Sequence, residues 1–396
     1  MNPSFFTEAQ TAPSPRPIRP VRLVFLTNQL TPYWKPVLHE LNVRCSQFRV
    51  LVSTVREPNR NWDVSWEGID VRLQRTLTVN TRWKHPRGFQ EPLFLHIPID
   101  TFAELRKFRP EVIISSEMGA RSLLATIYRL FHSNVKLVIW SEVTEWTEQG
   151  RGILRRPVRR LLMGRCDAFI TPGRASLKYL ESRGVDPRRI FKVPYATDVD
   201  NFARVPLFRS AECAHRLLYV GQLIERKGLR EFIAALCRWA DRHREREVEL
   251  CLVGEGCLGE ELNRPSRPTN FHLTLLGKLA YEQLPAVYAD FGILAAPTLA
   301  DTWGLTVNEA MASGLPVLGS AYGQAVAELV EEGRTGWVFR PDRPAEMDGA
   351  IEQCLGASVE TLNRMRPVVR EAALRLSPQR IAELLERAVT ICLNRN

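Results

Sequence analysis

Short runs of consecutive apolar residues alternate with longer helix-like stretches along this chain, and the whole pattern occurs twice. In the first half, five runs predict strands at residues 21–28, 48–54, 111–117, 136–142 and 166–173. In the second half, five more predict strands at residues 215–223, 248–256, 271–278, 291–298 and 315–320. Strands that are apolar throughout are buried on both faces, as in parallel sheets flanked by helices. The pattern therefore predicts an α/β protein with two doubly wound parallel-sheet domains.

Composition divides the chain further. Residues 1–20 hold five prolines and no apolar period, which predicts a disordered lead-in without the apolar core of a signal peptide. We expect the first domain at residues 21–200, the second at residues 201–375, and a last helix at residues 376–396. Ligands of such domains bind at the carboxyl ends of the strands, so a shared ligand would lie in the cleft between the domains.

The overall composition is that of an ordinary globular protein, with 45% hydrophobic and 25% charged residues among 396. No run reaches the roughly 18 apolar residues of a membrane-spanning helix, so we expect the chain not to cross a membrane. The eight cysteines include no CxxC pair, which favours small core residues of a reduced, cytoplasmic protein over disulfides. The seven histidines form no ligand-spaced cluster, which argues against a zinc site.

The positive charge belongs to the first half of the chain. The formal net charge is +10, and residues 1–200 carry 31 Lys and Arg against 19 Asp and Glu, whereas residues 201–396 carry 23 against 25. No nucleic-acid-binding motif accompanies this charge, so we expect no nucleic-acid partner.

Part of the surplus is concentrated in residues 151–165, where apolar residues keep helical spacing. The charge of this segment comes largely from four arginines, Arg155, Arg156, Arg159 and Arg160. Such a helix could lie on anionic lipid head groups or meet a phosphate-bearing acceptor. The other interpretation is an amphipathic helix packed on its own domain with solvated arginines.

The segment DTWGLTVNEAMASGLPV, residues 301–317, predicts a short helix after a strand and a loop. The helix is expected to begin near Leu305 and to end at Gly314, in the left-handed conformation that glycine favours. The N–H groups of Gly304, Leu305 and Thr306 at its start suit a phosphate.

Charged residues near this helix complete the pattern. Glu309, one turn into the helix, could accept hydrogen bonds from the two hydroxyls of a ribose, and Asp301 could bind sugar hydroxyls beyond the phosphates. Arg226 and Lys227 precede Gly228 at the start of another helix, where they could hold a diphosphate. Together these are the contacts that a nucleotide-sugar needs.

The glycines of GEGCLG, residues 254–259, formally satisfy the dinucleotide motif GxGxxG. The motif normally follows the first strand of a domain and opens a long helix, whereas here Pro265 cuts the helix short. A nucleotide-dependent oxidoreductase or epimerase that uses the Gly254 loop is therefore an alternative rather than the leading interpretation.

On these residues, the second half of the chain resembles the donor domain of the retaining glycosyltransferases of family 4, which have the GT-B architecture of two facing Rossmann-like domains. The resemblance extends over about residues 165–355. It rests on VGQLIERKG (220–228), VGEG (253–256), LLGKL (275–279), residues 301–317 in place of an E-x7-E pattern, and EEGRTGWVF (331–339).

The resemblance implies a hexosyltransferase that moves a sugar from a nucleotide diphosphate sugar to a saccharide or lipid-linked acceptor, in cell-surface or exported polysaccharide biosynthesis. It implies no metal and no other cofactor, a cytoplasmic location at or near the inner membrane face, and a last helix that crosses back to the first domain. The pair Asp198 and Asp200 is then the loop before the interdomain linker rather than a metal site.

The same resemblance assigns roles to residues. Lys227 would neutralise the donor diphosphate, Glu309 would hold the ribose, and Asp301 would contact the transferred sugar. The wider donor site would comprise Gly221, Gln222, Arg226, Gly254, Lys278, Leu279, Gly304, Leu305 and Thr306, with Lys278 and Leu279 beside the base. The acceptor side would comprise Thr31, Tyr33, Glu117, Glu142 and Glu145, whose three carboxylates could assist the acceptor hydroxyl.

The chain departs from the family pattern at four places, and two of them, Gln222 and Ser116, suggest one more alternative, a catalytically degenerate protein that binds a sugar or a partner. Gln222 stands where the family usually has arginine, and Asp301 replaces the first glutamate of the E-x7-E pattern. In the first domain, QLTPYW (29–34) replaces a glycine-rich loop, and Ser116 stands where many members place a histidine.

Overall fold

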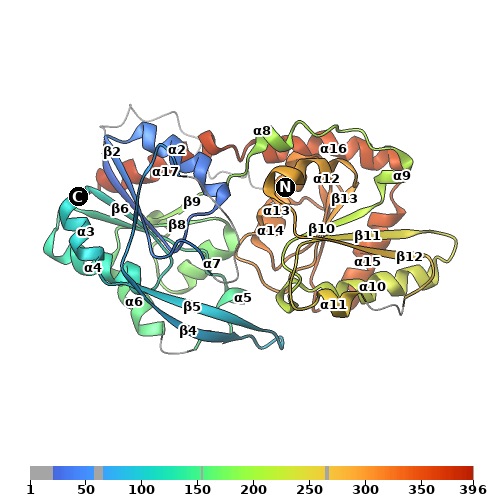
Figure 1. Ribbon diagram of the computed structural model, residues 1–396, viewed down its shortest axis with the longest axis horizontal. Coiled ribbons are helices and arrows are strands. Elements are labelled where there is room, and N and C mark those ends of the chain that lie inside the picture. The colour runs from blue at the N-terminus through green and yellow to red at the C-terminus, as the bar shows by residue number, and fades with distance from the viewer. Residues whose placement is uncertain (1–20, 58–65, 153–154, 264–266, 396) are drawn as a thin grey trace.

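The chain folds into two domains that lie side by side, each built on one parallel sheet flanked by helices (Figure 1). The structure is a computed structural model that describes residues 21–57, 66–152, 155–263 and 267–395. The expected lead-in, residues 1–20, and Pro265 lie outside the described residues.

The first domain has a seven-stranded sheet in the order β3-β2-β1-β6-β7-β8-β9. Its strands are β1 (Arg22–Thr27), β2 (Gln47–Val52), β3 (Asp70–Leu73), β6 (Val112–Ser116), β7 (Lys136–Trp140), β8 (Ala168–Thr171) and β9 (Ile190–Lys192). Its helices are α2 (Lys35–Arg44), α3 (Thr101–Phe108), α4 (Ala120–Phe131), α5 (Glu145–Glu148), α6 (Arg155–Arg165) and α7 (Arg174–Ser182). All neighbouring strands run parallel, and the strand order reverses at β1, as in doubly wound folds.

The second domain repeats this plan with six parallel strands in the order β12-β11-β10-β13-β14-β15. They are β10 (Leu217–Val220), β11 (Val248–Val253), β12 (Phe271–Gly277), β13 (Ile293–Ala296), β14 (Val317–Ser320) and β15 (Gly336–Phe339). The helices from the linker onward are α8 (Val199–Phe202), α9 (Ala211–Ala214), α10 (Leu229–Arg242), α11 (Gly259–Leu262), α12 (Leu284–Ala289), α13 (Leu305–Ala312), α14 (Gln324–Leu329), α15 (Pro344–Gly356), α16 (Val359–Leu374) and α17 (Pro378–Leu393). The strand order reverses at β10, so the predicted fold of two doubly wound sheets is confirmed.

All ten strands predicted from apolar runs are present, mostly with narrower bounds. The central residues of these strands are fully buried, as in Val24, Ile113 and Leu294. The apolar-run criterion missed the short outer strands β3, β9 and β15. It also missed an antiparallel hairpin of β4 (Thr76–Lys84) and β5 (Gln90–Pro98), which extends from the first domain toward the second (Figure 1). Most of β4 is exposed, so it carries no apolar run.

The last helix, α17, returns to the first domain and packs on α2 and β7. Its Leu385 is fully buried, and Glu386 accepts a hydrogen bond from Arg44 of α2 at 2.8 Å. The preceding helix, α16, packs on α13 of the second domain. The end of the chain therefore contacts both domains.

Two further expectations concern the chain as a whole. All eight cysteines are free, and of these Cys257 is exposed rather than part of the core. Within the described ranges, no helix combines the length and the apolar character needed to span a membrane.

We expect Leu385→Ala to lower the free energy of unfolding by about 2 to 5 kcal/mol, because it leaves a cavity where α17 meets the first domain. Urea denaturation of the two proteins measures the difference. Glu383→Ala on the exposed face of the same helix is the matched control, with an expected change within about 0.5 kcal/mol. A Leu385→Ala loss as small as that of the control would contradict the packing of α17.

Candidate functional site

A pocket lies at the carboxyl ends of β10 and β13 in the second domain. Its charged lining residues are Lys227 and Asp301, and the amino end of α13 contributes Gly304 and Thr306. The remaining lining residues are Tyr219, Val220, Ala295, Ala296, Pro297, Thr298, Trp303, Val307, Gly323 and Val326. A pocket of this kind, with a few converging polar groups, is the expected place for a ligand in a doubly wound domain.

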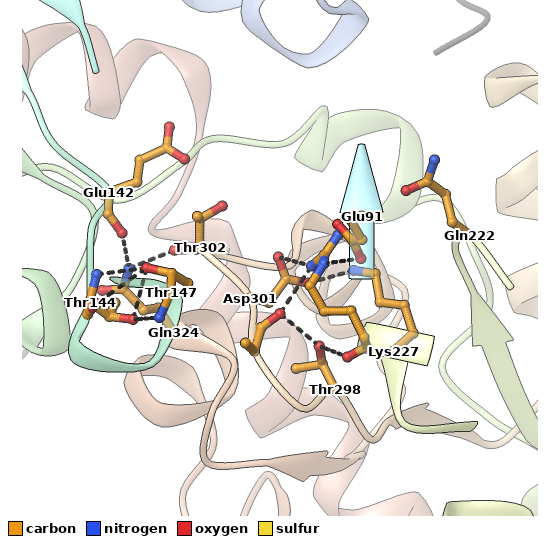
Figure 2. Close-up of polar contacts among 12 residues, drawn as sticks. Glu91, Glu142, Thr144, Thr147, Gln222, Lys227, Thr298, Asp301, Thr302 and Gln324 are labelled. Atoms are coloured by element: carbon orange, nitrogen blue, oxygen red, sulfur yellow. Dashed lines mark hydrogen bonds and ion pairs between the residues drawn. The ribbon is translucent and has the colours of Figure 1, made fainter. Parts of the chain in front are cut away.

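Lys227 and Asp301 are in direct contact inside this pocket. The Nζ atom of Lys227 lies 2.5 Å from Oδ2 of Asp301, and the two side chains are only 19% and 14% exposed (Figure 2). Burial alone would raise the pKa of the Asp301 carboxyl, but Lys227 and then Arg226 outweigh it and lower the pKa to about 2. Asp301 is therefore ionised at neutral pH and paired with a cation.

Arg226 is not among the residues that line the pocket. Its Nε atom donates to Oε1 of Glu91 at 2.7 Å, and its Nη1 donates to the carbonyl of Ala300 at 3.0 Å. Nη1 also lies 3.5 Å from Oδ1 of Asp301. We expected Arg226 to help hold a diphosphate. Its side chain instead forms hydrogen bonds with Glu91 of β5 and with the carbonyl of Ala300, and it does not line the pocket.

Backbone contacts fix the turn that carries both cations. Gly228 has a φ of 68°, and a Cβ atom at this position would lie 2.1 Å from the carbonyl of Pro297. The carbonyl of Arg226 accepts from the Leu299 N–H at 2.8 Å and from the Thr298 hydroxyl at 3.2 Å. The turn after β10 is thus tied to the loop after β13, which holds Lys227 beside Asp301.

The helix after this loop has the expected form. Helix α13 begins at Leu305 after Gly304, and Gly314 just past its end has a φ of 80°. The backbone N–H groups at the amino end of a helix carry partial positive charge. Since Gly304 and Thr306 line the pocket, that charge lies beside Lys227.

Glu309 is more deeply placed than the sequence suggested. Its side chain is 5% exposed, it does not line the pocket, and it accepts a hydrogen bond from the Tyr288 hydroxyl at 3.2 Å. Burial raises the pKa of the Glu309 carboxyl to about 7, against the opposing effect of that hydrogen bond. The sequence analysis missed Tyr288 as the partner of Glu309, because nothing in its local pattern distinguishes it from a core tyrosine.

The glycines assigned to the donor site allow two loops to pass closely. Gly254 has a φ of 136°, and a Cβ atom there would lie 1.9 Å from the carbonyl of Gly221. The helix after GEGCLG, α11, has only four residues, so this loop lacks the long helix of a dinucleotide site. Gln222 lies apart from Lys227 and Asp301 (Figure 2), and its carbonyl accepts from the Tyr219 hydroxyl at 2.7 Å.

Two residues assigned to the base lie just beyond the end of β12. Lys278 is exposed, and Leu279 is half-buried against the core of the second domain. Neither lines the pocket that holds Lys227.

Each of the two domains matches a known family model. A family model described as "Glycosyl transferases group 1" matches residues 214–357, and one described as "Glycosyl transferase 4-like domain" matches residues 31–196. The chain belongs to the GT-B glycosyltransferases of the family 4 kind.

Two curated relatives are similar to this glycosyltransferase over part of their length. The sulfoquinovosyl transferase SQD2 of Arabidopsis thaliana is 25% identical over 68% of the chain and 54% of its own length. A D-inositol 3-phosphate glycosyltransferase of Nocardia farcinica is 28% identical over 45% of the chain and 42% of its own length. The chain thus spans about half the length of these relatives. Among solved structures, Anabaena HepE in complex with UDP has a TM-score of 0.69 at 16% identity, covering 93% of this chain and all of HepE.

Of the residues expected on the acceptor side, Glu117 and Glu142 follow the neighbouring strands β6 and β7. Glu117 has a φ of 70° and accepts from Nδ2 of Asn28 at 2.6 Å, and Glu142 accepts from the Tyr195 hydroxyl. Glu145, in contrast, is exposed in the first turn of α5, and its assignment to the acceptor side stays a prediction.

The loop after β1 is packed rather than open. Thr31 is 5% exposed, and the Tyr33 ring lies 6.1 Å from the Tyr195 ring. Beside this loop lies Arg121, which sequence reasoning missed and which is 3% exposed. Its guanidinium donates to Oδ1 of Asn28, to the Ser53 hydroxyl at 3.0 Å, and to Ser116. Ser116, which stands in place of the family histidine, therefore accepts a hydrogen bond from the buried Arg121.

Gln324 of α14 joins the two domains at the edge of the site. Its Nε2 donates to the carbonyl of Glu142 at 3.2 Å and to that of Thr302 at 2.6 Å (Figure 2). Its Oε1 accepts from the N–H and hydroxyl of Ser176 at 3.1 and 2.9 Å. One buried amide thus connects the loop after β7 with the loop that carries Asp301.

Residues 155–165 form the expected basic helix α6, but its arginines are not equivalent. Arg159 is buried, forms an ion pair with Glu148, and lies 3.3 Å from the Tyr179 hydroxyl. It cannot take part in the predicted contact with lipid head groups, whereas Arg156 and Arg160 are exposed and Arg155 is partly so.

Asp198, the first aspartate of the rejected metal pair, caps α8 by accepting from the Asn201 N–H at 3.3 Å. Its side chain thus has a local role at the interdomain linker.

The raised pKa of Glu309 predicts a pH-dependent stability. Between pH 4.5 and about 7 the Glu309 carboxyl keeps its proton in the folded protein but loses it in the unfolded chain. The contribution of this carboxyl to the free energy of unfolding is therefore fully present below pH 4.5 and is lost as the pH rises through 7. We therefore expect the thermal midpoint of Glu309→Gln, relative to wild type, to increase from pH 5 to pH 8. Differential scanning fluorimetry measures the difference, with the exposed Glu383→Gln as a control that stays parallel. A parallel Glu309→Gln profile would refute the burial effect.

Proposed function

We propose that this glycosyltransferase moves a sugar from a nucleotide diphosphate sugar, with retention of configuration, to a saccharide or lipid-linked acceptor. The observation that carries the proposal is the contact of Lys227 and Asp301 beside the amino end of α13, in a pocket at the carboxyl ends of the strands. Structures of Anabaena HepE, which has the same fold, contain UDP or UDP-glucose. The family and the acceptor-side loops fit a role in cell-surface or exported polysaccharide biosynthesis.

In this proposal the protein stabilises the leaving group by electrostatics. Lys227 and the N–H groups of Gly304, Leu305 and Thr306 neutralise the diphosphate as its charge grows. Asp301 binds hydroxyls of the transferred sugar, and Glu309 accepts from the ribose. The acceptor hydroxyl attacks from the face that the diphosphate leaves, and the departing phosphate takes its proton. Because these protein groups supply the positive charge, we propose that the reaction requires no metal.

A non-catalytic sugar-binding protein is the competing proposal. One observation favours it: Arg226 is engaged by Glu91, so Lys227 is the one cation among the described residues that line the pocket. Turnover of a donor in the presence of membrane extract separates the two proposals, because only an enzyme releases the nucleoside diphosphate.

We also propose that the first domain docks on the anionic inner face of a membrane. Helix α4 packs on α6 and exposes three apolar residues, Ile127, Leu130 and Phe131, of which Phe131 is 74% exposed. The neighbouring α6 exposes Arg156 and Arg160. Apolar and basic side chains on adjoining helices are the combination that anionic bilayers bind, and this position suits a lipid-linked acceptor.

We expect UDP, GDP or ADP to raise the thermal midpoint of the wild-type protein, since a ligand at 100 times its Kd adds about 2.7 kcal/mol of stability. Lys227→Ala and Glu309→Ala should abolish this shift, because each removes a donor contact. The exposed Lys107→Ala is the matched control and should keep it. Absence of a shift with all three nucleotides would contradict the donor site, and slow hydrolysis of the corresponding sugar donors would identify the base.

Membrane docking predicts sedimentation with vesicles that contain phosphatidylglycerol but not with vesicles of phosphatidylcholine alone. Each basic residue near an anionic leaflet contributes about 1 kcal/mol, so Arg156→Glu with Arg160→Glu should lower partitioning by more than about tenfold. The matched control is Arg334→Glu with Arg375→Glu, which reverses the charge of two exposed arginines in the second half of the chain. This double variant should bind the vesicles as wild type does. Equal loss in both double variants would mean that net charge, not this surface, directs binding.

A further inference from the structure

The hairpin β4–β5 of the first domain docks directly on the loop that carries Asp301. Trp83 and Phe89 of the hairpin form one buried cluster with Leu299 and Ala300 of the second domain. Asp301 is the next residue along the chain. The acceptor-binding half of the molecule therefore supports the loop that holds the proposed sugar-binding carboxylate.

The same hairpin brings a fourth charge to the site. Glu91 of β5 lies 2.7 Å from Nε of Arg226, and their side chains are only 19% and 13% exposed. Arg226 in turn lies 3.5 Å from Asp301, and Asp301 lies 2.5 Å from Lys227. The four side chains form an unbroken row of alternating charges, two positive and two negative, that sums to zero.

A donor diphosphate would change this row. For Lys227 to neutralise the diphosphate, its ammonium has to leave Asp301, which would then be a buried carboxylate without its nearest cation. Among the described residues, Arg226 is the other cation that makes an ion pair with Asp301. It can keep Asp301 ionised and in place provided that it stays where it is and is not itself drawn to the diphosphate.

We propose that Glu91 is a positioning residue for the transfer reaction: from the first domain, it holds Arg226 on Asp301 while Lys227 binds the diphosphate. The proposal rests on the proposed function, in which Asp301 contacts the sugar. It assigns the two adjacent cations different tasks, Lys227 to the leaving group and Arg226 to the carboxylate. It also makes the sugar site depend on the acceptor domain, because Glu91 reaches Arg226 only while the hairpin is docked.

The hairpin has other contacts with the second domain, so the ion pair between Glu91 and Arg226 is not needed simply to hold it there. Arg87 near the hairpin tip already makes an ion pair with Asp342 at 3.1 Å and lies over the Tyr322 ring at 4.4 Å. These contacts hold the hairpin to the second domain without touching Arg226 or Asp301. Glu91, in contrast, pairs with the guanidinium that contacts Asp301.

The test is Glu91→Gln, which keeps the shape and removes the charge. Arg226 is then no longer neutralised, so we expect UDP, followed by isothermal titration, to bind roughly threefold to tenfold more tightly. Asp301 is less well placed, so we expect kcat for donor hydrolysis or transfer to fall about tenfold or more. Tighter nucleotide binding with slower turnover is a combination that a loss of structure does not produce.

Two further variants make the outcome decisive. Arg87→Gln removes the ion pair with Asp342 but leaves the buried cluster of Trp83 and Phe89 that keeps the hairpin docked, so it should leave the UDP affinity unchanged. In an Arg226→Gln background, Glu91→Gln should have no further effect on kcat, since the two residues act as one unit.

Other outcomes overturn the proposal. If the wild type turns over a donor and Glu91→Gln has an unchanged kcat, or weaker UDP binding like a misfolded variant, the inference is wrong while the proposed function stands. If the wild type binds no nucleoside diphosphate and hydrolyses no donor, the proposed function fails, and the inference fails with it.

Discussion

The contact between Lys227 and Asp301 is the interaction on which the site depends. Two opposite charges lie almost buried in one pocket. Such a pair is stable only when the two charged groups are held in direct contact with good geometry, because both have lost their contact with water. Backbone contacts hold the two side chains in place. The close approach of Gly228 to Pro297 and the hydrogen bonds to the Arg226 carbonyl join the loops that follow β10 and β13. A ligand that brings negative charge enters a site whose cation is already positioned.

The two domains contribute unequally to this site. The second domain supplies the pocket, the helix α13 and both members of the ion pair, whereas the first supplies supports that reach across: Glu91 from the hairpin and Glu142 through Gln324. Enzymes that join two substrates benefit from such an arrangement, since the reacting groups are aligned only when the halves are together. The hairpin is thus an interdomain contact that also reaches the ion pairs beside the pocket.

The sequence predicted the sheet strands well because buried parallel strands are continuous apolar runs. It missed the hairpin, whose strand β4 is mostly exposed, and it could not pair Glu91 with Arg226, which lie 135 positions apart. Lys227 and Asp301 were both identified from local motifs, and the structure brings them into contact. Glu309 and Arg159 contact Tyr288 and Tyr179, which lie 21 and 20 positions away and which no local pattern pairs with them.

The most direct test is a crystal structure of the protein with a nucleotide diphosphate sugar that it binds. The account predicts that the Lys227 ammonium has moved from Asp301 to the diphosphate, that the phosphates lie at the amino end of α13, and that Asp301 keeps Arg226 and faces the sugar. A donor bound elsewhere, or bound here with Lys227 still on Asp301 and Arg226 on the phosphates, would contradict it.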